Sequence, residues 1–153
     1  METIKFKKLH KAAQLPTKKD GDIGWDCYVV HDDDGNWAYN GDAWVFNLQP
    51  RKGRIFKTGL QVELPHGLNL LLWDRSGLSA VKHVHRLAGV IDSTYRGEIM
   101  IALYNLSDKV VTITEGDRIA QGVLQWEVPA VMEWTEELNT TNRGGNGFGS
   151  TGK

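Results

Sequence analysis

The 153-residue chain has little cysteine, no long apolar run and almost no net charge, and each of these absences excludes a class of protein. Its single cysteine, Cys27, excludes an intrachain disulfide and is compatible with a reducing cytoplasm. The longest apolar run, residues 70–73, is far too short to span a bilayer, and residues 1–13 lack the apolar segment of a signal peptide. A formal charge of −1 provides no broad basic surface for duplex DNA. We therefore expect a soluble, cytoplasmic protein that binds neither membranes nor nucleic acid.

Short alternating runs separated by turn residues are the dominant pattern. Leu60, Val62 and Leu64 alternate with polar residues, which predicts a half-buried strand. Residues 98–104 are apolar at nearly every position and predict a central strand buried on both faces. No window sustains a capped helical period, and residues 76–83 predict at most two helical turns. Many short strands with glycine turns predict an all-β domain, a jelly roll or distorted β-barrel.

Two segments depart from this pattern. Residues 31–44 form a polar excursion within the barrel domain, which we place at 1–138. Residues 139–153 are rich in glycine, and we expect them to form a mobile arm. The final seven residues, GFGSTGK, nearly match a phosphate-binding P-loop. Because a P-loop needs a helix directly after it, and none follows in the sequence, this match predicts no P-loop.

Two partial matches to metal motifs carry little weight. Asp32, Asp34 and Asn36 have the spacing of a calcium loop, but the glycine and glutamate that such a loop requires are replaced by Trp37 and Ala43. A solvated turn is the better interpretation. The His-x-His pair at 83 and 85 would place both rings on one face of a strand, but a third ligand is missing.

Three segments could bind or activate a phosphorylated ligand. Arg75, Ser76 and the amide of Gly77 follow an apolar strand and could clamp an oxyanion, although Arg-Ser-Gly is also an ordinary turn. Asp92 could act as a general base, or it could be the aspartate of an Asx turn. In the arm, Phe148 could stack on a base while Arg143 holds phosphate.

In this order along the chain, five segments resemble the five motifs of the trimeric dUTPase family. They are "GDIGWDCY" (21–28), "RSGLS" (75–79), "GVIDSTYRG" (89–97), "GDRIAQ" (116–121) and "RGGNGFGSTG" (143–152). The first departs from the usual form at Trp25 and Cys27, and Thr94 replaces a common acidic residue in the third. The resemblance implies a jelly-roll subunit of a homotrimer, with active sites shared between subunits. The implied reaction is hydrolysis of dUTP to dUMP and pyrophosphate, with Mg2+ on the triphosphate.

The resemblance also implies a role for each matching residue. Asp92 would be the general base that activates water, Gln121 would help to hold that water, and Asp26 would hydrogen-bond a water on the Mg2+ ion. Tyr95 would stack under the deoxyribose and exclude a 2′-OH, and the hairpin at Gly89 would recognise uracil. The phosphates and the base would be held by Arg75, Ser76, Gly77, Arg143, Phe148, Gly149, Ser150 and Thr151.

Two alternatives remain open from the residues alone. A dCTP deaminase shares this fold, but the glutamate that deaminases use would fall at Ala102, so this activity is disfavoured. A trimeric binding or regulatory protein is the second alternative, with residues 31–44 as the surface for a protein partner.

Overall fold

The computed structural model describes residues 2–145 and has an all-β fold, as the alternating sequence predicts. The single helical element is a short π-helix, η1 (Gly77–Val81), among the residues described. The strands are β1 (Lys5–Lys8), β2 (Trp25–Tyr28), β3 (Ala38–Tyr39), β4 (Trp44–Leu48), β5 (Gly53–Glu63), β6 (Leu68–Trp73), β7 (Val84–Arg86), β8 (Val90–Ile91), β9 (Glu98–Asn105), β10 (Val111–Thr114) and β11 (Arg118–Trp126).

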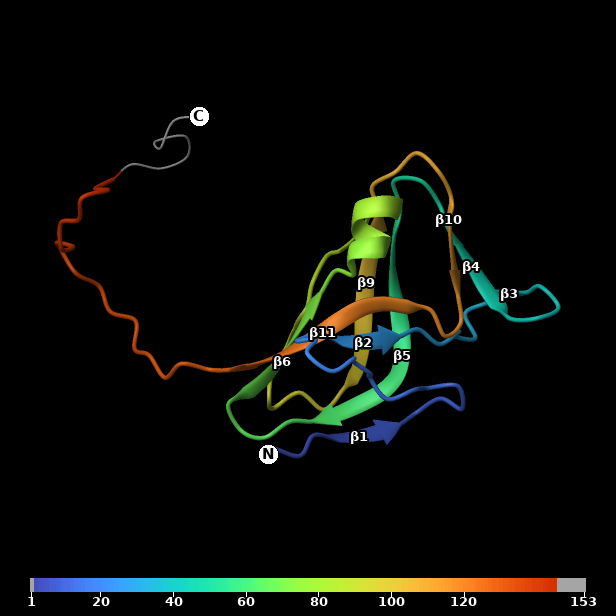
Figure 1. The fold of residues 1–153 in the computed structure, drawn as a ribbon, viewed down its shortest axis with the longest axis horizontal. Coiled ribbons are helices and arrows are strands. Elements are labelled where there is room, and N and C mark those ends of the chain that lie inside the picture. Colours follow the sequence, from blue (N-terminus) through green and yellow to red (C-terminus); the bar gives the residue numbers. More distant parts are fainter. Residues whose placement is uncertain (1, 146–153) are drawn as a thin grey trace.

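The strands form three antiparallel sheets around one main apolar core (Figure 1). The sheet orders are β1-β5-β9-β7, β10-β4-β3 and β2-β11-β6-β8. Neighbours in each sheet are mostly distant in sequence: β11 lies between β2 and β6, and β5 pairs with β9. This topology brings residues from the beginning, middle and end of the chain into the third sheet, which carries the candidate site.

The alternation predicted around residues 60–64 is confirmed. Leu60, Val62 and Leu64 are buried, and Glu63 is exposed. The register of β5 against β9 shifts at Gly59, whose φ of 68° favours glycine. A Cβ at Gly59 would also lie 2.7 Å from the Cβ of His10. The irregularity therefore keeps the inward face apolar on both sides of a bend.

The prediction that β9 is buried on both faces is wrong for the chain by itself. Ile99, Ile101 and Leu103 point into the core and are at most 2% exposed. Met100, on the opposite face, is 43% exposed. Among the described residues no second layer covers this outer face of the sheet.

Residues 31–44 are anchored to the barrel at a few positions, while residues 33–36 and 38–42 are exposed, as expected of a polar excursion with a solvated turn. Trp37 is 7% exposed and belongs to the main core, and β3 pairs with β4. The Arg54 guanidinium binds Asp32 and Asp34 at 2.9 and 2.7 Å, so one arginine bridges these two carboxylates. Whether this segment also contacts a protein partner stays a prediction.

The chain leaves the barrel after β11. Residues 127–145 form no helix or strand and are exposed, and they run away from the barrel in Figure 1. The apolar side chains of Met132 and Trp134 are fully exposed. In residues 2–145 no helix has the length and apolar character needed to cross a membrane.

Candidate functional site

Strand register places three of the predicted motifs in one row. Gln121 in β11 pairs with Asp26 in β2 on one side and with Trp73, the last residue of β6, on the other. Directly paired residues in adjacent antiparallel strands present their side chains on the same face. The Asp74–Ser76 turn follows Trp73 immediately, so the register brings Asp26, Gln121 and this turn together.

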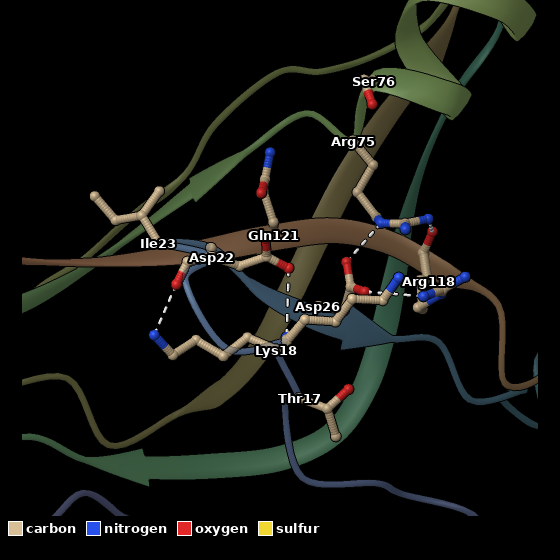
Figure 2. A pocket seen from close by; sticks show the side chains of 11 residues that line it. Thr17, Lys18, Asp22, Ile23, Asp26, Arg75, Ser76, Arg118 and Gln121 are labelled. Atoms are coloured by element: carbon tan, nitrogen blue, oxygen red, sulfur yellow. Dashed lines mark hydrogen bonds and ion pairs between the residues drawn. The ribbon is translucent and has the colours of Figure 1, made fainter.

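Asp26, Arg75, Ser76 and Gln121 line a cavity of about 650 Å³ (Figure 2). Its lining contains four cationic and two anionic side chains, and this balance suits an anionic ligand. The lining residues are Thr17, Lys18, Lys19, Asp22, Ile23, Gly24, Asp26, Arg75, Ser76, Arg118 and Gln121.

The centre of the cavity is an arginine–aspartate–arginine cluster. Arg75 Nε donates to Asp26 Oδ1 at 2.6 Å, and Arg118 Nη1 donates to Asp26 Oδ2 at 3.2 Å. Arg75 Nη1 also donates to the main-chain carbonyl of Arg118 at 3.3 Å. Asp26 is thus shared by two guanidinium groups, which it holds side by side facing the cavity.

The carboxamide of Gln121 is oriented by two neighbours. Its Nε2 donates to the main-chain carbonyl of Asp74 at 2.8 Å. On its other side the oxygen lies against Gly24, where a Cβ would overlap Gln121 Oε1. A methyl group at residue 24 would therefore displace the Gln121 carboxamide, whereas glycine leaves the Gln121 oxygen as a hydrogen-bond acceptor at the cavity.

The unusual residues of the first motif have structural explanations. Cys27 is 3% exposed in the main core, and burial, together with the neighbouring Asp26 charge, raises the pKa of its thiol to about 12. It therefore packs as a small apolar side chain. The Trp25 ring lies 5.3 Å from Lys18 Nζ, a cation–π contact that places the lysine at the edge of the cavity.

The third motif lies apart from this cavity in the same chain. Asp92 directly follows β8, is exposed, and accepts a hydrogen bond from Tyr95 N–H through its main-chain carbonyl at 2.9 Å. Neither Asp92, Tyr95 nor Gly89 lines the cavity. Gly89 lies close to β6, where its carbonyl accepts from Leu72 N–H at 2.7 Å.

The remaining predicted residues are placed as follows. Gly77 begins η1 next to the cavity but does not line it. Arg143 lies in the exposed segment after the barrel. The rest of the predicted arm set lies outside the described residues: Phe148, Gly149, Ser150 and Thr151.

Sequence reasoning missed several cavity residues. Lys18, Lys19 and Asp22 enter through an isolated bridge in which Thr17 pairs with Asp26. Arg118 lies within the fourth motif, but the resemblance implies no role for it. The adjacent lysines before "GDIGWD" were the signal available in the sequence, and nothing local indicated that they reach the same cavity as Arg75.

The His-x-His prediction is also corrected. His83 precedes β7 with a left-handed backbone, φ 56°, and only His85 lies in the strand. His85 Nδ1 donates to Asp74 Oδ2 at 2.6 Å. Within residues 2–145 the one group of three potential metal ligands is His10, His31 and Glu115, and none of them lines the cavity.

Comparison with known proteins identifies relatives along nearly the whole chain. The family model for dUTPase matches residues 43–152. A deoxyuridine 5'-triphosphate nucleotidohydrolase from Helicobacter pylori is 38% identical over 152 residues, covering 97% of this chain and 96% of that one. The enzyme of the same name from Paramecium bursaria Chlorella virus 1 is 38% identical and covers 99% of both. The solved structure of a Staphylococcus bacteriophage 80alpha dUTPase variant with dUpNHpp has a TM-score of 0.82 at 25% identity, covering both chains completely.

Proposed function

The chain belongs to the dUTPase family, and we propose that the cavity between β2, β11 and the end of β6 holds the triphosphate while dUTP is hydrolysed to dUMP and pyrophosphate. The observation that carries this assignment is the convergence of Asp26, Arg75, Ser76 and Gln121, from three separate motifs, on one cationic cavity. A relative of known fold bound to dUpNHpp supports a ligand of this chemistry.

Arg75, Ser76 and the amide of Gly77 hold the phosphates in this proposal. The guanidinium of Arg75 now binds Asp26, so its position is fixed before the ligand arrives. Phosphate oxygens then accept from its remaining N–H groups and from the Ser76 hydroxyl. Positive charge in this position stabilises the negative charge that develops on the departing pyrophosphate.

The hydrolytic step needs a general base and a hydrogen-bond acceptor that orients the attacking water. Asp92 takes a proton from water as the water oxygen attacks the α-phosphorus, and the bond from this phosphorus to the bridging oxygen of pyrophosphate breaks. Gln121 Oε1 accepts a hydrogen bond from the same water, because its Nε2 is already engaged by Asp74. In the related dCTP deaminase mechanism an acid is needed at Ala102, which lies in β9 opposite Ile55 and supplies none.

Selectivity for base and sugar is assigned to the hairpin after β8. Uracil binds along the main chain near Gly89, and the deoxyribose lies on Tyr95. The Tyr95 hydroxyl donates to the Glu98 carbonyl at 2.9 Å, and its ring lies where a Cβ at Gly97 would be. These contacts hold the ring in place, which a filter against the 2′-OH requires. Arg143, Phe148, Gly149, Ser150 and Thr151 close the site as a cover over base and phosphates.

Magnesium fits the cavity as an ion held mainly by the substrate. Both oxygens of Asp26 already accept from arginines, which leaves lone pairs for a metal-bound water and disfavours direct coordination. Mg2+ commonly keeps several waters and takes its other ligands from phosphate oxygens. When bound, it neutralises triphosphate charge.

A homotrimer with shared sites accounts for three observations. Asp92 and Tyr95 lie outside the cavity that contains Gln121. Met100 is exposed on the outer face of β9, and the segment that includes Met132 and Trp134 finds no packing partner on its own barrel among the described residues. Neighbouring copies would cover these surfaces and bring an Asp92 to each cavity.

We also place the protein in the cytoplasm.

A substrate panel tests the proposed reaction. With Mg2+ present, dUTP should release pyrophosphate and dUMP, whereas dTTP, dCTP and UTP should react far more slowly because of the methyl group, the exocyclic amine and the 2′-OH. Pyrophosphate release and base identity are followed together by chromatography. Formation of dUTP from dCTP would identify a deaminase, and tight dUTP binding without pyrophosphate would identify a binding protein.

Gly24→Ala is expected to lower kcat for dUTP on the order of 10- to 100-fold with little change in Tm, because the new methyl group displaces the Gln121 carboxamide rather than main chain. The measurement is steady-state kinetics alongside thermal unfolding. Gln121→Ala and the double variant complete a cycle. If Gly24→Ala slows the enzyme equally when Gln121 is already absent, the displacement of Gln121 is not the cause.

A further inference from the structure

Asp74 connects two parts of the cavity wall, the Arg75–Ser76 segment and Gln121, although it does not itself line the cavity. It lies between the end of β6 and Arg75. Its Oδ2 accepts from His85 Nδ1 at 2.6 Å and from Ser79 Oγ at 3.1 Å. Its Oδ1 accepts from Arg86 N–H at 2.9 Å.

The main chain of Asp74 makes the remaining connection. Its carbonyl accepts from Gln121 Nε2 at 2.8 Å, across 47 residues of sequence. The next carbonyl, that of Arg75, accepts from Leu78 N–H and Ser79 N–H at 3.1 and 2.8 Å. The side chain of Asp74 therefore fixes the turn onto β7 and η1, while its carbonyl fixes Gln121 in β11.

The carboxylate is held in its charged form. Partial burial raises the pKa of Asp74, but the hydrogen bonds from Arg86 N–H, His85 and Ser79 together outweigh this and lower the pKa below its ordinary value. Asp74 thus accepts all three hydrogen bonds at neutral pH. Hydrogen bonds to a charged acceptor are roughly twice as strong as neutral ones.

We propose that Asp74 is a positioning residue for dUTP hydrolysis, which sets the phosphate-binding turn at Arg75–Ser76 and the water-binding carboxamide of Gln121 in one geometry. This inference rests on the proposed function. Such coupling matters because the segment after β6 and the Gln121 side chain of β11 must act on neighbouring atoms, the α-phosphorus and its attacking water. A displacement of about 1 Å between such groups can lower a rate by about 10²-fold.

The dependence on Asp74 differs from that on an ordinary surface ion pair. Asp108 and Arg51 form such a pair at 2.9 Å, but the Asp108 side chain is 83% exposed, whereas that of Asp74 is 26% exposed. Exposed pairs of this kind contribute little. Asp108→Ala is therefore a matched control, since it removes a carboxylate from an ion pair outside the cavity.

The test compares Asp74→Ala, Asp74→Asn and Asp108→Ala by dUTP turnover, by binding of dUpNHpp and by thermal unfolding. For Asp74→Ala we expect a fall in kcat/KM of about 10²-fold, shared between a lower kcat through Gln121 and a higher KM through Arg75 and Ser76. Asp74→Asn keeps the acceptor for Arg86 N–H and should recover part of both. Asp108→Ala should leave kcat and KM unchanged.

Three other results would overturn the role of Asp74 or the proposed function. If Asp74→Ala lowers Tm but keeps wild-type kcat and KM well below its melting temperature, the residue is only structural and the inference is wrong. If Asp74→Ala does not fold, the double variant Ser79→Ala/His85→Ala removes both donors to Oδ2, and unchanged kcat/KM in that variant overturns the inference. A wild-type protein that binds dUpNHpp but releases no pyrophosphate overturns the proposed function itself, and the inference with it.

Discussion

Replacing Asp92 by asparagine should lower dUTP turnover by roughly 10²–10⁴-fold, the contribution expected of a general base. Asparagine has the same shape but cannot take a proton from water at neutral pH. The Asp92 carboxylate is exposed and makes no hydrogen bond among the described residues, so the exchange disturbs no fold contact there. Binding of dUpNHpp should consequently remain nearly unchanged, and calorimetry beside single-turnover kinetics measures both quantities.

Asp33→Asn provides the matched control for this charge removal. Asp33 is exposed in the segment before β3 and lines no part of the cavity, so its replacement should leave turnover unaltered. Normal turnover in Asp92→Asn would refute the general-base assignment. Loss of dUpNHpp binding in the same variant would instead assign Asp92 to substrate binding.

Mixing two inactive chains should restore activity if each site is built across subunits. One parent carries Asp92→Asn with an intact arm, and the other keeps Asp92 but is truncated before Arg143. When trimers assemble at random from a 1:1 mixture of the two chains, about a quarter of the sites combine an intact Asp92 from one chain with an intact arm from another. Activity should therefore rise from the background of either parent to about a quarter of the wild-type value.

The chains must exchange subunits for this result, so they are unfolded and refolded together. The control is the same two proteins refolded separately and then mixed, which should stay near background. A double mutant carrying both changes, treated alike, should also remain inactive. No recovery after co-refolding, with trimers present by light scattering, would place Asp92 and the arm in one subunit's site.

The strands and the family motifs could be read directly from the chain. Alternation at Leu60, Val62 and Leu64 depends only on the two-residue period of a strand, which is a local property. The five motif segments are likewise contiguous, so their order was visible without a structure. The burial of Cys27 and Trp37 in the core could not be predicted from the sequence. Both have polar neighbours along the chain, and the strands that cover them are distant in sequence.

Local sequence patterns do not predict which residues line the cavity. Lys18 and Arg118 reach it through a bridge at Thr17 and through the pairing of β11 with β2. Asp74 stood beside a recognised motif, yet its importance comes from partners on β7, η1 and β11. Each of these contacts joins residues from separate elements.

The sequence by itself determined an all-β domain and the dUTPase family, because the first follows from the two-residue period of the strands and the second from contiguous motifs. Only the tertiary structure decided that Asp26 is shared by Arg75 and Arg118, that Gly24 faces Gln121, and that Asp92 lies apart from their cavity. The physical reason is strand register: a shift of one residue turns every side chain to the other face, and the hydrogen bonds that set this register join positions far apart in the chain.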